Sequence, residues 1–215
     1  MIPRTLLAMA AVLLVVPAAA AQNHDPDHAV KGGAFPPGWS GRTDRGQPLD
    51  NVSFRAMGPG LHVTLGPASI LYREADNATG SYEVSATITQ TKAPTHPEAY
   101  GLFIGGKDLG GDGQAYTYFL IRGNGEFLVK RRAGAQTSDV AAWTANGAVK
   151  AQDEAGKATN ILTVAVGPDR VRFLVNGTEV HSTPRSAVDA DGIAGLRVNH
   201  NLDLHVDGFG VKKGT

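Results

Sequence analysis

The sequence predicts an all-β protein, an antiparallel β-sandwich, and three observations carry that prediction. Short runs rich in Val, Ile, Phe and Tyr follow one another from Tyr100 to Val211. The pairs Asn124-Gly125 and Asn176-Gly177 separate such runs, and both residue types tolerate the positive φ that tight hairpin turns require. No window after residue 22 sustains the i, i+3, i+4, i+7 apolar pattern of an amphipathic helix, so we expect little helix.

The first 21 residues have the three parts of an export signal. Arg4 supplies the positive charge, Leu6 to Val16 forms the apolar run, and Ala19-Ala20-Ala21 provides a small-residue cleavage site. The run has about 11 residues, whereas a bilayer core needs roughly 20. We therefore expect cleavage before Gln22, a periplasmic or secreted protein, and no membrane insertion of the mature chain.

The rest of the chain has the composition of one domain. A chain of roughly 190 residues buries about 70% of its unfolded surface, so it sustains a core without disulfides, and the sequence has 0 Cys. The full chain has 20 basic and 20 acidic residues, and loss of Arg4 with the signal leaves 19 against 20, so no basic field exists to attract nucleic acid. We expect an extended or disordered arm over residues 22–38 and the sandwich domain over residues 39–213.

The early strands are assigned from turn residues and alternation. Leu61 to Leu65 and Ser69 to Tyr72 flank Gly66-Pro67 and are expected to form a hairpin. Tyr82 to Thr89 alternates apolar and polar residues, so this strand should have one buried face and one solvent face. Lys92 to Glu98, which holds two prolines, is the loop that follows.

The later strands are assigned from the same two signals, turn residues and alternation. We assign strands to residues 100–104, 115–122, 160–166, 170–175, 178–182, 192–198 and 202–211. In the fourth of these, Val171, Phe173 and Val175 should point to one side, and in the last, Leu202, Leu204 and Val206 should face the core.

The Asn124-Gly125 turn predicts a candidate binding face. A two-residue loop would pair Arg122 with Phe127 and Tyr118 with Arg131. Both sides of the hairpin then mix apolar and cationic residues, whereas a sandwich strand is usually apolar on one side and polar on the other. The outer side is either a ligand platform or a surface that Arg and Lys stems cover. The candidate ligand-binding residues are Trp39, Tyr116, Tyr118, Arg122, Arg131 and Trp143.

Two polar clusters are candidates for chemistry. Asp203, His205 and Asp207 alternate along one strand, so they share a face where a carboxylate can orient an imidazole or hold a divalent ion; the alternative is a polar stripe facing solvent. Asp108 and Asp112 lie in a Gly-rich loop whose carboxylates and carbonyls suit Ca²⁺, although the loop lacks the spacing of an EF-hand and is otherwise a plain flexible loop.

The order of these segments resembles the concanavalin A-like and laminin-G-like jelly rolls, and most closely the exported bacterial 3-keto-disaccharide hydrolase-type domains. The segments that carry the resemblance are Gly38-Trp39, Ala68 to Tyr72, Tyr82-Glu83-Val84, Tyr100 to Phe103, Tyr116 to Phe119, Phe173 to Gly177 and Gly192 to Val198. The resemblance implies two curved sheets with a face that commonly binds sugar. It carries no catalytic set, because the E-x-D-x-x-E strand of laminarinases is matched only by Glu74 to Thr79, which ends in Thr.

Three functions follow as hypotheses. The first is an exported protein that binds a glycan or a small sugar without chemistry, since sugar rings pack on aromatic side chains while Arg bonds their hydroxyls. The second is a glycoside or keto-disaccharide hydrolase that uses Asp203, His205 and Asp207. The third is a structural domain of the cell envelope. One fold serves all three, so the fold alone does not choose among them.

Overall fold

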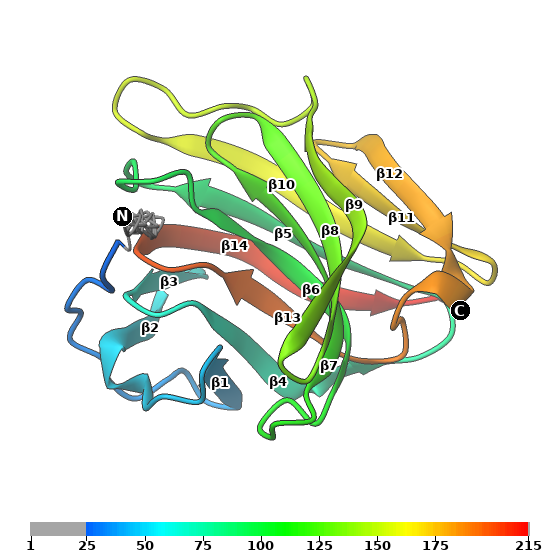
Figure 1. Ribbon diagram of the computed structural model, residues 1–215, viewed down its shortest axis with the longest axis horizontal. Coiled ribbons are helices and arrows are strands. Elements are labelled where there is room, and N and C mark those ends of the chain that lie inside the picture. The colour runs from blue at the N-terminus through cyan, green and yellow to red at the C-terminus, as the bar shows by residue number, and fades with distance from the viewer. Residues whose placement is uncertain (1–24, 215) are drawn as a thin grey trace, which may run out of the picture.

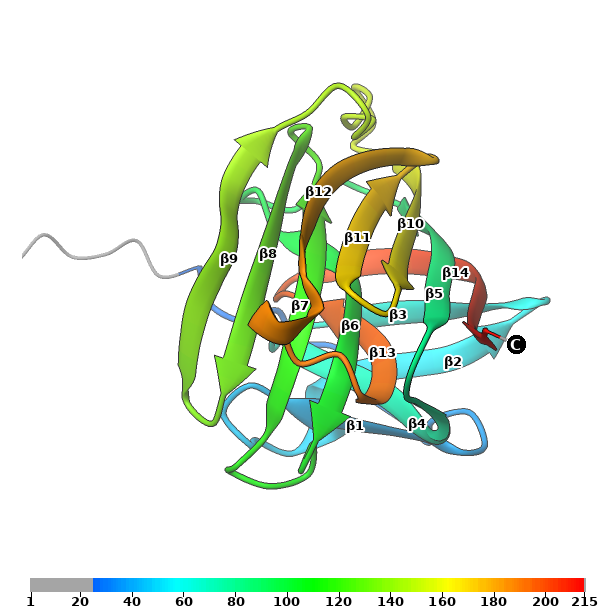
Figure 2. The ribbon, with the colours of Figure 1, turned by 90° about the vertical axis from the view of Figure 1, so that its right-hand side faces the viewer.

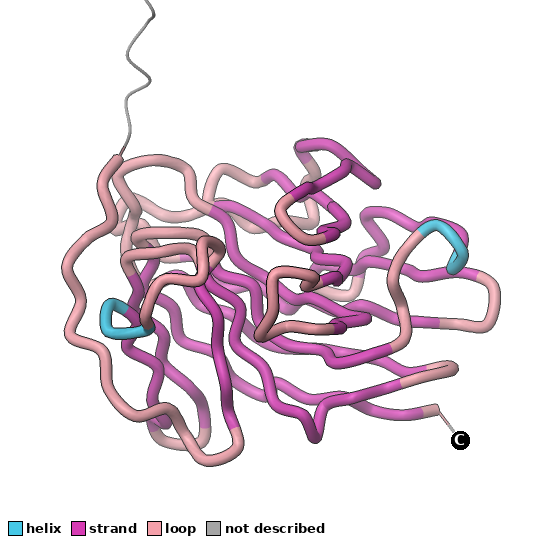
Figure 3. The backbone as a smooth tube through the Cα atoms, turned by 60° about the horizontal axis from the view of Figure 1, so that its bottom comes forward, coloured by secondary structure: helices cyan, strands magenta, loops and turns pink. Residues whose placement is uncertain are grey.

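The computed structural model describes residues 25–214, and in that range fourteen strands form two antiparallel seven-stranded sheets (Figure 1). The predicted β-sandwich is confirmed. The only helical segments within residues 25–214 are two short 3-10 turns, η1 (Leu49–Asn51) and η2 (Arg185–Ala187), which Figure 3 shows at the ends of the sandwich. The predicted signal peptide, residues 1–21, lies outside the described residues.

The two sheets pack face to face, and Figure 2 shows them nearly edge-on. Sheet A has the order β1 (Trp39–Thr43), β4 (Ser69–Ala78), β13 (Gly192–Val198), β6 (Ala99–Lys107), β7 (Ala115–Arg122), β8 (Glu126–Ala133) and β9 (Gln136–Ala145). Sheet B has the order β12 (Thr178–Pro184), β11 (Arg170–Val175), β10 (Ala158–Val166), β5 (Tyr82–Gln90), β14 (Leu202–Lys213), β3 (Gly60–Leu65) and β2 (Val52–Met57).

Alternating side chains from both sheets form the main core. In β5 every second residue from Tyr82 to Gln90 is buried, as the alternation predicts. Phe119 of sheet A lies 5.4 Å from Phe173 of sheet B between ring centroids, so the rings join the two layers. Val171, Phe173, Val175, Leu202, Leu204 and Val206 all belong to this core, as predicted.

Sheet A is buried on its other side as well. A second apolar cluster covers the face that points away from sheet B; it comprises Ile70, Tyr72, Ala99, Phe103, Leu109, Tyr116, Tyr118, Leu120, Leu128 and Ile193. Leu109 comes from the β6–β7 loop, so this loop folds over the sheet instead of extending into solvent. We call this side the outer face of sheet A.

The predicted hairpin at residues 61–72 was wrong. β3 belongs to sheet B and β4 to sheet A, so the chain crosses between the layers at Gly66-Pro67-Ala68. The backbone of this connection bonds to other segments: Gly66 N donates to Asn51 O at 3.1 Å, and Ala68 O accepts from Asp44 N at 2.9 Å. A Gly-Pro pair signals a turn but does not say in which sheet the chain continues.

The arm that precedes β1 is extended and held against the sandwich. The Asn201 side chain accepts a hydrogen bond from His28 N at 2.7 Å and donates to Asp25 and to Pro26 O at 3.1 and 3.0 Å. Asn51 makes a similar two-sided contact with His28 and Val30. Two buried or half-buried amides therefore fix residues 25–30 of the arm. No helix within residues 25–214 is long and apolar enough to cross a membrane.

Candidate functional site

The register of the β7–β8 hairpin determines which side chains share the outer face of sheet A. Arg122 pairs with Glu126, Leu120 with Leu128 and Tyr118 with Lys130, so the loop has three residues, Gly123 to Gly125. The two-residue register predicted from Asn124-Gly125 was wrong. Only Gly125 takes a positive φ, at 88°, which fits a turn closed by a left-handed glycine, whereas a two-residue type I′ turn needs positive φ at both residues.

This one-residue shift moves every side chain of β8 to the opposite face. Lys130 and Arg132 therefore join Tyr116 and Tyr118 on the outer face, and Arg131 does not. Arg131 lies on the side of Phe127 and Val129, where its Nη2 is 3.1 Å from Asp189 Oδ2 in the loop after η2. The predicted grouping of Arg131 with the two tyrosines is thus corrected.

The outer face forms two rows of neighbouring residues across the strands. One row runs through Arg42, Ile70, Arg197, Gly101, Leu120 and Leu128. The next runs through Ser40, Tyr72, Gly195, Phe103, Tyr118, Lys130 and Asp139. Gly101 has no side chain, and it pairs with both Arg197 and Leu120. The Arg197 guanidinium extends toward the β7 tyrosines and lies 5.8 Å from the Tyr118 ring centroid.

Asp44 bridges two arginines of this face. Arg197 donates from Nη1 and Nη2 to the two Asp44 carboxylate oxygens at 2.6 and 2.7 Å. Arg132 Nη1 lies 3.3 Å from Asp44 Oδ1, and Arg132 Nη2 donates to the Asp44 backbone oxygen at 3.3 Å. Burial acts to lower the pKa of Arg197, but Tyr116 and Asp44 outweigh it and raise that pKa, so the guanidinium stays charged.

The tyrosines of the outer face stay protonated, so their hydroxyl groups are neutral beside these charges. Burial raises the pKa of Tyr116 and of Tyr118, and the Arg197 charge only partly offsets that increase. Their ring centroids are 5.7 Å apart, and Phe103 lies 5.1 Å from Tyr116. The side chains therefore form a packed aromatic layer with polar atoms at its edge.

Several buried polar atoms of this layer have no hydrogen-bond partner within residues 25–214. They are the Tyr116 hydroxyl oxygen, Arg197 Nε and Arg42 Nη1. Tyr116 is fully buried and Arg197 is only 6% exposed. Buried polar groups in native proteins are nearly always hydrogen-bonded to protein or to ordered water, so a water molecule can satisfy these three donors.

Trp143 and Arg122 form an exposed aromatic platform at one end of the outer face. The Arg122 guanidinium lies 4.1 Å from the Trp143 ring centroid, and Arg122 Nε donates to Glu126 at 2.6 Å. Trp143 lies in the edge strand β9 and is 36% exposed. Arg122 holds one side of the indole in place, so the tryptophan offers a fixed apolar surface to a ligand.

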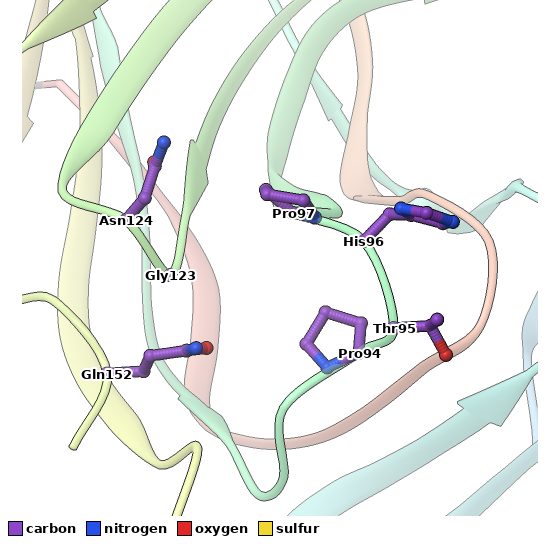
Figure 4. Close-up of a pocket in the computed structure, with 7 residues that line it drawn as sticks. All are labelled: Pro94, Thr95, His96, Pro97, Gly123, Asn124 and Gln152. Atoms are coloured by element: carbon purple, nitrogen blue, oxygen red, sulfur yellow. The ribbon is translucent and has the colours of Figure 1, made fainter. Parts of the chain in front are cut away.

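A pocket of about 180 Å³ adjoins this platform, because its lining includes Gly123 and Asn124 directly after Arg122. Figure 4 shows Asn124 and Gln152 on one side of the pocket and Pro94 and Pro97 on the other. The Gln152 side chain is fixed by a 2.7 Å hydrogen bond from Gln90 Nε2 to its Oε1. The β5–β6, β7–β8 and β9–β10 loops thus meet beside the platform.

Trp39 does not lie on the outer face. Its ring contacts Phe54 and Phe209 of sheet B, with centroid distances of 5.0 and 5.4 Å, so it packs between the two sheets at the β1 edge. Arg73 covers it, with the guanidinium carbon 4.9 Å from the ring centroid. The structure assigns Trp39 a packing role and separates it from the other candidate ligand-binding residues.

Asp203, His205 and Asp207 share one face of β14, on the outer side of sheet B. Asp203 accepts from Thr64 Oγ1 at 3.0 Å and lies 3.3 Å from His62 Nε2, while Asp207 lies 3.2 Å from His205 Nε2. Asp203 and Asp207 thus have separate histidine partners. This trio is on the opposite side of the molecule from Tyr116 and Arg197, so two candidate sites predicted from the sequence do not meet.

Asp108 and Asp112 do not converge on a common point. Asp112 Oδ1 pairs with Arg42 Nη2 at 2.8 Å, while the Asp108 carboxylate lies against the turn at Gly111 and Gly113. Within residues 25–214, no group of three His, Cys, Asp or Glu side chains is arranged to hold a metal ion. The predicted calcium loop instead packs Leu109 onto the outer face and places Asp112 on Arg42.

Four charged residues of the outer face were missed from the sequence: Arg42, Asp44, Arg132 and Arg197. Arg42 and Asp44 lie two residues apart, Arg132 ends the basic run that starts at Lys130, and Arg197 is 153 positions from Asp44. Arg197 in Gly192 to Val198 offered the one available signal, since it is the only charged residue in an otherwise apolar strand. A charge in the middle of a buried strand needs a partner, and here that partner is Asp44.

No family model matches the sequence, and no curated protein matches it either. Solved structures do match. The carbohydrate-binding module CBM66 from Bacillus subtilis superposes with a TM-score of 0.59 at 13% identity, covering 87% of this chain and 99% of the module. A GH16 protein from Bacteroides ovatus, in complex with a mixed-linkage glucan product, gives 0.58 at 8% identity over 85% of this chain and 98% of that chain.

A family 7 alginate lyase, A1-II′, gives a TM-score of 0.54 at 13% identity and covers 83% of this chain and 99% of its own. At these identities the likeness establishes the fold. The protein is a concanavalin A-like jelly roll, as the sequence resemblance implied; the finer likeness to 3-keto-disaccharide hydrolase-type domains stays a prediction.

Proposed function

We propose that this protein is an exported carbohydrate-binding protein whose ligand lies across the outer face of sheet A. The observation that carries the proposal is the aromatic platform of Trp143 on Arg122, which continues along the same face into Tyr118 and Lys130. Support also comes from the fold, because the solved structures with this jelly roll include proteins named for binding or cleaving carbohydrate.

The chemistry of the face suits a sugar. The CH side of a pyranose ring is apolar and packs on an indole, while its hydroxyls need donors and acceptors at the ring edge. Trp143 supplies the apolar surface, and Arg122 and Lys130 supply the polar groups. Arg122 and Trp143 are already fixed by their mutual contact and by Glu126, so little side-chain entropy is lost on binding.

The proposal is binding without turnover. Glycoside hydrolysis needs two carboxyl groups that are free to act on the substrate. On the outer face, Asp44 is shared by Arg197 and Arg132, Asp112 pairs with Arg42, and Asp139 lies 3.1 Å from Lys130. These carboxylates hold cations in place, which supports a recognition surface. Export to the periplasm or beyond belongs to the same proposal and rests on Arg4, the apolar run and the Ala19 to Ala21 site.

The test is a glycan array with the mature protein, followed by calorimetric titration of the glycans that bind. Trp143→Ala should weaken binding by about 1 to 3 kcal/mol, as expected for loss of an aromatic stacking partner. The matched control is Ile161→Ala, which removes an apolar side chain that is 48% exposed on the outer side of sheet B. Equal affinity in the Trp143→Ala and Ile161→Ala proteins would reject the outer face of sheet A as the binding surface.

A further inference from the structure

The charges on the outer face of sheet A are not balanced around Asp44. Arg197 and Arg132 both bind this one carboxylate. Both arginines are buried, with side chains 7% and 10% exposed, so solvent screens the surplus positive charge weakly. Two guanidinium groups that share one carboxylate leave one positive charge that a second anion can neutralise.

Arg42, on β1, gives the same indication from the far side of β4. It lies in the row of Arg197, separated from it by Ile70, so their Cα atoms are about 10 Å apart. Its Nη2 pairs with Asp112, whose side chain is fully exposed, while its Nη1 is buried and has no partner within residues 25–214. An exposed ion pair contributes little to stability, so an incoming anion can replace Asp112 at low cost.

From these contacts we infer that the bound glycan is acidic, and that Arg42 with the Arg197 and Arg132 pair recognises a sugar carboxylate. The inference rests on the proposed carbohydrate function and adds the class of ligand. A carboxylate fits the planar fork of a guanidinium with two parallel hydrogen bonds. The contact that a sugar carboxylate can take is Arg42 Nη2, which Asp112 occupies at the surface. Arg42 Nη1, Arg197 Nε and the Tyr116 hydroxyl lie beneath it, so Arg197 and Arg132 act on the anion through their charge.

The closing experiment compares each acidic oligosaccharide with its own methyl ester, which keeps the sugar and removes the charge. Oligomers of galacturonate, glucuronate and mannuronate, each as free acid and as ester, are titrated into the mature protein, with a neutral glucan and a sulfated oligosaccharide alongside. We expect at least one free acid to bind about tenfold tighter than its ester, the effect of one charge-assisted hydrogen bond. This preference should shrink as salt is added.

Two variants connect the preference to the residues. Arg42→Gln should lower affinity for the free acid about tenfold and leave the ester unchanged. Asp112→Asn should raise affinity for the free acid severalfold, because it removes the carboxylate that competes for Arg42. Asp112 is fully exposed, so this variant tests the proposal without disturbing the fold. Thermal melts accompany both variants.

The outcomes separate the inference from the proposed function. If neutral glucans and esters bind as tightly as the acids and Asp112→Asn changes nothing, the carboxylate inference fails and carbohydrate binding stands. If only the sulfated oligosaccharide binds tightly, the face recognises an anion but not a carboxylate, and the inference is likewise overturned. If no glycan of any kind binds, the proposed function itself fails.

Discussion

Arg197 and Asp44 form a two-hydrogen-bond ion pair, with Nη1–Oδ1 and Nη2–Oδ2 distances of 2.6 and 2.7 Å, on the outer face of sheet A. The pair joins β13 to the loop after β1, and this loop also receives a hydrogen bond from Arg132. Burying a guanidinium is costly unless a carboxylate meets it in good geometry. Asp44 therefore stabilises the fold and fixes the arginines at the same time.

Asp44→Asn should destabilise the protein strongly, because it leaves the buried Arg197 and Arg132 charges without a carboxylate. Removing one partner of a buried ion pair typically lowers the free energy of unfolding by about 3 to 5 kcal/mol. Urea unfolding followed by tryptophan fluorescence measures the change. Asp139→Asn is the control, since Asp139 pairs with Lys130 on the same face but is exposed; similar stability losses in the two variants would contradict the role assigned to Asp44.

Gly125→Ala should cost about 1 to 2 kcal/mol of unfolding free energy, because residue 125 has a φ of 88° in the three-residue β7–β8 loop. Gly147→Ala is the matched control. Gly147 is exposed, lacks a positive φ, and has no atom within 4 Å of the position its Cβ would take. That substitution should be neutral or slightly stabilising. Equal effects at the two positions would argue against the left-handed conformation of Gly125.

Tyr118 should contribute mainly to stability through its ring. It is 8% exposed and belongs to the outer apolar cluster, so Tyr118→Ala should cost about 3 to 5 kcal/mol from the cavity left behind. Tyr118→Phe keeps the ring and should retain most of the stability, as measured by thermal and urea melts. A stable, cooperative Tyr118→Ala protein would show that the outer cluster is looser than the structure indicates.

The stability of the protein should fall as the pH drops below about 6.5. Burial lowers the pKa of His62 below its ordinary 6.5, although Asp203 acts in the opposite direction, while Arg55 and His205 lower it further. The unfolded state then binds a proton at a higher pH than the folded state, so the free energy of unfolding decreases as the pH falls from 7 toward 5. Burial lowers the pKa of His181 too, so it adds to the same trend.

Urea unfolding of the native protein and of His62→Gln between pH 8 and 5 measures this contribution. The variant should lose less stability over that range than the native protein, because it lacks one of the histidines whose pKa is lowered by folding. A native protein that gains stability on acidification to pH 5.5, or identical slopes for the two proteins, would be inconsistent with a lowered His62 pKa.

Asn201→Gly should release the arm at residues 25–30. The Asn201 amide bonds His28, Asp25 and Pro26, and glycine keeps the positive φ of 56° that residue 201 adopts, so the variant removes the amide without straining the backbone. Limited proteolysis should then cut within the arm faster than in the native protein, while the strands stay protected. Asn176→Gly at the β11–β12 turn is not expected to expose the arm, and equal cleavage in both would refute the anchoring role.

The fold class and the orientation of most strands follow from local patterns in the sequence. Alternation in Tyr82 to Gln90 and the apolar sets around Phe173 and Leu204 each placed one face in the core, because a strand repeats every two residues and water separates apolar from polar sides. The Asn176-Gly177 turn was also readable: both residues have positive φ, 50° and 81°, and Val175 pairs with Thr178 across it.

The residues that share the outer face of sheet A are set by long-range strand pairing. The Asn124-Gly125 pair looked the same in sequence, yet a third residue entered its loop, and that single step exchanged Arg131 for Arg132 and Lys130. The charged set of Arg42, Asp44, Arg132 and Arg197 comes from separate segments that meet only when strands β1, β13 and β8 are arranged in one sheet with its loops folded over it. Local patterns record which way a side chain points, whereas long-range pairing decides what it meets.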